Sequence, residues 1–132
     1  MSLVLPPPSL ISTIAAASNF REFVRLVQPA HEIGWHHQQI IEALERVFAH
    51  QCLRLQISAP PRSGKSSLGT VAAAAFYRGL YPDHDILLVA STQDLADQFS
   101  RDVRRIVSEF GERLWGIHLD ETSKAVNDWG LA

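Results

Sequence analysis

The stretch SAPPRSGKSS (58–67) carries a glycine, a lysine and two serines in the order found in phosphate-binding loops. The usual pattern is G-x-x-x-x-G-K-[ST]. Its backbone N–H groups approach phosphate oxygens, its lysine reaches the terminal phosphates and its hydroxyl ligates magnesium. Gly64, Lys65 and Ser66 match this pattern, whereas Ala59 stands where the first glycine is expected. The following proline favours β backbone for Ala59, which an alanine adopts without strain. Taken alone, the motif also fits a basic, solvated turn.

The residues on either side of the loop predict a strand before it and a helix after it. Residues 53–58 alternate apolar and polar side chains, which predicts a short strand. After the loop, apolar residues recur at helical spacing until Gly79 and Pro82. The apolar run ILLVA (86–90) is typical of a strand covered on both faces in a parallel sheet. The sequence therefore predicts an α/β fold: a P-loop NTPase-type parallel sheet flanked by helices, incomplete as an amino-terminal fragment and preceded by a helical segment.

Three further helices are predicted from periodicity and capping signals. One lies within 11–27 and ends before Pro29, and another occupies most of 31–50. The last begins near STQD, where Ser91 and Asp94 have the spacing of a capping box.

The domain organisation follows from the proline-rich start of the chain. Successive prolines in LPPPS (5–9) exclude a helix. We expect residues 1–19 to form a proline-containing leader. We expect residues 20–132 to form the amino-terminal part of a P-loop ATPase domain, without its acidic strand and without a nuclease domain.

Composition excludes several classes of protein. The chain has 132 residues, of which 46% are hydrophobic and 20% are charged, as in an ordinary globular domain. A single cysteine, Cys52, cannot form an intramolecular disulfide, and the start of the chain lacks the charged region of a signal peptide. The cytoplasm is therefore the expected compartment. No apolar run is long enough to cross a membrane.

A net charge of −2 gives no overall signature of nucleic-acid binding, so a DNA contact would require a local basic patch. Arg101, Arg104 and Arg105 lie at helical spacing and offer such a patch for DNA phosphate or for a neighbouring subunit. The alternative is a solvated face on which these arginines pair with nearby carboxylates.

Four segments, in this order and spacing, resemble the amino-terminal ATPase region of the large terminase subunit of tailed bacteriophages. They are GWHHQQIIEALERV, RLQISAPPRSGKSSL, DILLVASTQDLADQFSRDVRRIV and DETSKAVNDWGL, and the resemblance covers about residues 20–132. It implies part of an ATP-driven motor that packages double-stranded DNA into procapsids in the host cytoplasm. The implied cofactors are ATP and Mg²⁺. The implied partners of the parent protein are double-stranded DNA, a small terminase subunit, the portal or procapsid, and further copies in a homo-oligomeric ring, with no membrane involved.

The resemblance also implies roles for individual residues. Lys65 and Arg62 would act in catalysis, Arg62 by sensing or polarising the γ-phosphate, and Ser66 would ligate magnesium. A contact with adenine falls to His37 or Gln38, between which the sequence leaves the choice open; Trp35 is expected to pack rather than to stack on a base. The nucleotide-binding loop itself comprises Ala59, Pro60, Pro61, Arg62, Ser63, Gly64, Lys65, Ser66 and Ser67.

Two other patterns are weak candidates for a site. His36 and His37 are expected to project apart on a helix, with no cysteine or carboxylate at ligand spacing, which argues against structural zinc. Asp120 and Glu121 form a poor acidic strand, because Gly116 and His118 interrupt the apolar run before them.

We therefore expect the parent protein to be an ATPase that also cuts DNA with a carboxy-terminal nuclease domain. This chain alone is expected to have little or no activity. The alternatives are another P-loop ATPase, such as a helicase-like motor, or a non-catalytic remnant that acts only as a binding or interaction module.

Overall fold

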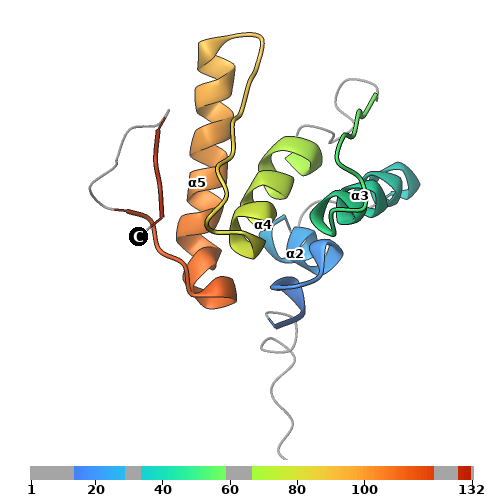
Figure 1. The fold of residues 1–132 in the computed structure, drawn as a ribbon, viewed down its shortest axis with the longest axis horizontal. Helices are drawn as coiled ribbons and strands as arrows, with labels where there is room; N and C mark the ends of the chain where they lie inside the picture. Colours follow the sequence, from blue (N-terminus) through green and yellow to red (C-terminus); the bar gives the residue numbers. More distant parts are fainter. Residues whose placement is uncertain (1–13, 29–33, 59–66, 121–127, 132) are drawn as a thin grey trace, which may run out of the picture.

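The computed structural model of this protein describes residues 14–28, 34–58, 67–120 and 128–131. The helices of this part enclose one core (Figure 1). They are α2 (Phe20–Val27), α3 (Trp35–Phe48), the π-helix η1 (Ser67–Ala72), α4 (Ala73–Leu80) and α5 (Gln93–Trp115). Periodicity therefore placed these helices correctly, with α2 shorter than the predicted segment.

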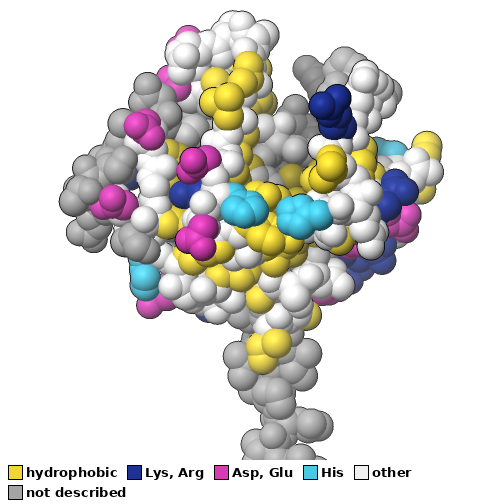
Figure 2. All heavy atoms as spheres, viewed as in Figure 1, with side chains coloured by type: hydrophobic (Ala, Val, Ile, Leu, Met, Phe, Trp, Pro, Cys, Tyr) yellow, Lys and Arg dark blue, Asp and Glu magenta, His cyan; other side chains and the backbone are white. Residues whose placement is uncertain are grey.

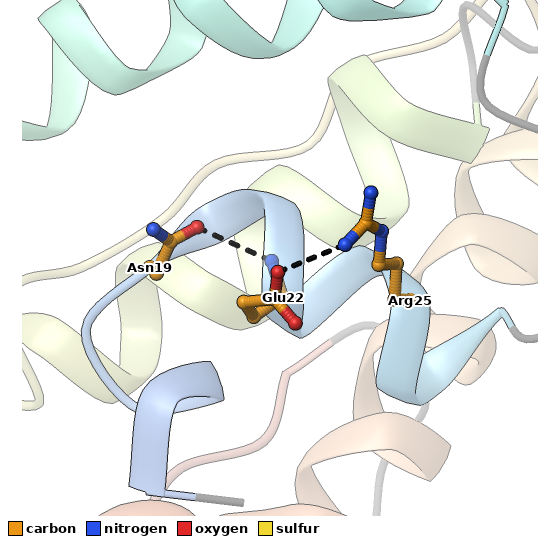
Figure 3. Close-up of polar contacts among 3 residues, drawn as sticks. All are labelled: Asn19, Glu22 and Arg25. Atoms are coloured by element: carbon orange, nitrogen blue, oxygen red, sulfur yellow. Dashed lines mark hydrogen bonds and ion pairs between the residues drawn. The ribbon is translucent and has the colours of Figure 1, made fainter. Parts of the chain in front are cut away.

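Helix α2 is capped at its start by Asn19, whose side chain accepts a hydrogen bond from the Glu22 N–H at 3.2 Å. This contact satisfies one of the backbone donors at the helix start. Glu22 also pairs with Arg25 at 3.0 Å, one turn further along the helix (Figure 3). The carboxylate lies in the first turn and the guanidinium in the last, an arrangement that complements the helix dipole.

The longest helix, α5, is capped at both ends. Thr92, not Ser91, is its N-cap, and the Thr92 hydroxyl accepts a hydrogen bond from the Leu95 N–H at 3.2 Å. The predicted capping-box position was therefore wrong by one residue. At the other end, Gly116 adopts a φ of 67°, the left-handed conformation that glycine reaches without steric cost.

Aromatic rings form the centre of the core. Phe76 of α4 lies with its ring centroid 5.0 Å from Phe48 of α3 and 5.3 Å from both Phe20 and Phe23 of α2. Trp115, at the end of α5, packs 5.4 Å from Phe23 and donates its indole N–H to the Ala17 carbonyl at 2.8 Å. These contacts join the described helices through one aromatic cluster.

The predicted parallel sheet is wrong. The described residues are 63% helical and 3% in strand, and the strand fraction comes from isolated bridge positions such as the antiparallel bridge between Leu119 and Leu131. Neither 53–58 nor 86–90 is assigned as a strand. The chain is therefore not an α/β protein in its described part.

The physical reason lies in the packing of α4. Alanines and Phe76 of this helix pack against other helices rather than on a sheet face. In the view of Figure 1, α4 is drawn between segment 53–58, which leads away from α3, and segment 81–92, which runs alongside α5. Alternating or apolar residues form a ladder only when another strand lies beside them.

Candidate functional site

Most of the predicted nucleotide-binding loop lies outside the described residues. This applies to Ala59, Pro60, Pro61, Arg62, Ser63, Gly64, Lys65 and Ser66. Ser67 is described and begins η1. A helix therefore starts directly after the Gly-Lys-Ser motif, as the sequence predicted.

The residues that flank the loop lie close together. A Cβ atom placed on Gly69 would lie 3.5 Å from Ile57 Cδ1, which is an ordinary van der Waals distance. Ile57 precedes the loop and Gly69 follows it, so residues 59–66 connect two points that are close in space. In a P-loop NTPase the loop joins a strand to a helix, and the described residues here show the helix but no strand before residue 59.

The start of the helix after the loop is held by the core. Leu68 and Ala72 are fully buried, and Val71 is 7% exposed. Six residues of η1 have π-helical hydrogen bonding, a rare geometry that recurs at functional sites. The backbone N–H groups at this helix start are thereby anchored next to the Gly-Lys-Ser motif.

His37 and Gln38, the two candidates for an adenine contact, differ in the structure. His37 is 8% exposed, and its Nδ1 accepts a hydrogen bond from the Gly34 N–H at 3.0 Å. This bond closes the first turn of α3 and occupies the Nδ1 lone pair of His37. Gln38 is exposed. A side-chain amide that faces solvent can both donate to and accept from the edge of a base.

Two expectations about the neighbouring aromatic residues were wrong. Trp35 does not pack in the core but is 74% exposed at the start of α3. The rings of His36 and His37 do not project apart, because their centroids lie 3.8 Å from each other. His36 also contacts Trp35 edge-on, with 5.6 Å between the centroids.

The arginines of α5 lie in a mixed-charge environment. Arg105 pairs with Asp102 at 3.9 Å and its side chain is 70% exposed. Arg104 lines a polar hollow together with Glu112 and Asp120. Arg101 is exposed. This surface has the paired, solvated character that was the alternative to a nucleic-acid patch.

Asp120 lies in an irregular segment after α5. Its backbone N–H donates to the Gly130 carbonyl at 2.9 Å, next to the Leu119–Leu131 bridge. Glu121 lies outside the described residues.

A hollow with a mixed apolar and polar lining lies between α4 and α5 and has a volume of about 360 Å³. Its walls are Ala74 and Arg78 of α4, Asp97 and Ser100 of α5, and residues 85–88 of the connecting segment.

The described ranges contain no group of three or more His, Cys, Asp or Glu side chains arranged to hold a metal ion. Within the same ranges, each helix is too short or too polar to span a membrane.

Comparison of the chain with family models, curated proteins and solved structures finds no match.

Proposed function

We propose that this chain is the ATP-binding part of a DNA-packaging motor of the terminase large-subunit type. The observation that carries the proposal is the Gly64-Lys65-Ser66 motif directly before the buried start of η1, with Ile57 and Gly69 brought together at its flanks. The described residues supply the helix after the loop but not the strand before it, so the proposal rests on the motif and on η1. ATP and Mg²⁺ would bind at the helix start, and the parent protein would act on double-stranded DNA with a small terminase subunit, a portal or procapsid and further copies of itself.

Each residue of the proposed site has a distinct chemical task. Lys65 would place a point charge on the terminal phosphates, and Ser66 would ligate magnesium. The planar guanidinium of Arg62 can bind two γ-phosphate oxygens at once. We assign the adenine contact to Gln38, because His37 is buried and caps α3.

Binding of ATP should raise the melting temperature of this chain, and Lys65→Ala should abolish the rise. A ligand that binds only the folded state at about 100 times its Kd adds about 2.7 kcal/mol of stability. Differential scanning fluorimetry with millimolar ATP and Mg²⁺ measures this effect. Lys124, the other lysine in the sequence, supplies a matched control, since Lys124→Ala removes the same charge outside the motif. An unchanged melting temperature of the wild-type chain would contradict the proposal and favour a non-catalytic interaction module.

Arg62→Ala should remove the preference for ATP over ADP while leaving the binding of ADP intact. The reason is that Arg62 is assigned to the γ-phosphate, which ADP lacks, whereas Lys65 also contacts phosphate oxygens that ADP retains. Parallel titrations of both nucleotides, followed by the melting temperature, test this division. Arg101→Ala is the charge-matched control on α5. An equal loss of ATP and ADP binding in Arg62→Ala would mean that Arg62 does not distinguish the γ-phosphate.

A further inference from the structure

Two apolar segments of this protein are exposed and lack a backbone partner in the described part of the chain. Leu53 is 84% exposed and Leu55 is 38% exposed, while Leu87 and Val89 are 86% and 81% exposed. Among the described residues, no backbone-to-backbone hydrogen bond involves 53–57 or 86–89. Unpaired N–H and C=O groups beside apolar side chains form a template for pairing with another strand.

The segment 86–89 presents one apolar row outward. Leu88 is half-buried against the core, whereas its neighbours Leu87 and Val89 face solvent. Such alternation is the side-chain pattern of a strand with one covered face. Figure 2 shows hydrophobic side chains exposed on this face of the molecule, with Asp and Glu side chains close by.

The surroundings of this segment favour a cationic partner. Among the described residues that line the hollow beside 85–88, Asp85 and Asp97 carry carboxylates and Arg78 carries a positive charge. The Arg78 guanidinium already donates to the His84 carbonyl. An excess of carboxylates beside an apolar strand selects a segment that combines aliphatic and basic side chains.

Segment 53–57 has this chemistry. Leu53 and Leu55 are exposed on either side of Arg54, which is itself exposed, and Ile57 anchors the end of the segment to the core. Within one molecule, no described backbone hydrogen bond joins this segment to 86–89. A second copy of the chain can therefore supply the strand partner that segment 86–89 does not have within its own molecule.

We infer that residues 53–57 of one copy pair as a strand with residues 86–89 of a second copy, with Arg54 facing the carboxylates around Asp85. Each chain carries both segments, so two copies related by a two-fold axis form the contact twice. The pairing covers Leu53, Leu55, Leu87 and Val89 and gives backbone partners to both segments, in which the Arg54 carbonyl already accepts a hydrogen bond from Cys52 Sγ at 3.1 Å.

The first test measures the oligomeric state of the full chain in solution. Sedimentation velocity over a range of concentrations should show a dimer, and Leu87→Lys should raise its dissociation constant by at least about tenfold, because it places a charge in an apolar contact. Leu87 is exposed, so the variant should keep the denaturation midpoint of the wild-type monomer. A wild-type chain that stays monomeric at submillimolar concentration would overturn the inference.

The second test is charge exchange between separately tagged chains. Arg54→Glu and Asp85→Arg should each weaken self-association by about fivefold. An equimolar mixture of the two variants should recover wild-type affinity, because the glutamate introduced in one chain then meets the arginine introduced in the other, while the native Arg54 and Asp85 meet at the second contact. Arg101→Glu and Glu109→Arg on α5 are matched controls that should leave the dissociation constant unchanged. If the mixture does not recover wild-type affinity and only the double variant Arg54→Glu/Asp85→Arg does, the two residues meet within a single molecule. That result would overturn the inference.

Discussion

Replacing Phe76 by alanine should lower the free energy of unfolding by about 3–5 kcal/mol. Phe76 is 2% exposed, and its ring contacts Phe20, Phe23, Phe48 and Trp115 at centroid distances of 5.3, 5.3, 5.0 and 6.0 Å. The substitution removes the ring that links α4 to the other helices and leaves a cavity among the four remaining rings. Domains are stable by only about 5–15 kcal/mol, so this loss is a large share of the total. Urea denaturation followed by far-UV circular dichroism measures it.

Phe110 provides the matched control for this change. Its side chain is half-buried on α5, with the Arg113 guanidinium 5.3 Å from the ring centroid. Phe110→Ala should cost about 1 kcal/mol, because less apolar surface is removed from its contacts. Equal losses for the two variants would mean that Phe76 does not hold the core together.

The helices were predictable because the signals that form them are local. Ile40, Ile41 and Leu44 repeat at helical spacing, and all three are buried on one face of α3. The helix predicted within 11–27 is not continuous: it is interrupted before the N-cap Asn19, α2 follows with a new register, and Ile14 is 62% exposed. A side chain that caps a helix ends the periodicity of the segment before it.

The exposure of Trp35 could have been predicted from the helical register of α3. The buried face of α3 includes His37, Ile41, Leu44 and Phe48, at spacings of three and four residues. Trp35 precedes His37 by two positions, which places it on another side of the helix. The helical register therefore already indicated an exposed tryptophan.

Local patterns could not predict that the described part of the chain would form no sheet. Residues 53–58 alternate as a strand does, yet pairing is a non-local event that depends on what the rest of the chain places beside them. The aromatic contacts among α2, α3 and α4 bring the helices together without a sheet between them. The nucleotide-binding candidate stays a prediction, because Gly64, Lys65 and Ser66 lie outside the described residues.

Gly79→Ala should destabilise the protein by about 3 kcal/mol, although alanine is the better helix former by about 1 kcal/mol. A Cβ atom on Gly79 would lie 2.2 to 2.4 Å from three ring atoms of Trp115. The indole has little room to move, because it packs on Phe23 and donates its N–H to the Ala17 carbonyl. Thermal or urea denaturation of the single variant measures the cost. Gly69→Ala, whose Cβ would meet Ile57 at an ordinary 3.5 Å, is the matched control and should be tolerated.

The clash predicts strong coupling between Gly79 and Trp115. Trp115→Leu alone should destabilise the protein, since it removes aromatic packing and the hydrogen bond to Ala17. In that background the indole is gone, so Gly79→Ala should become neutral or stabilise by up to about 1 kcal/mol through helix propensity alone. A double-mutant cycle built from the four denaturation free energies measures this coupling. If Gly79→Ala costs the same with tryptophan or leucine at position 115, contact with the indole is not what requires glycine in α4.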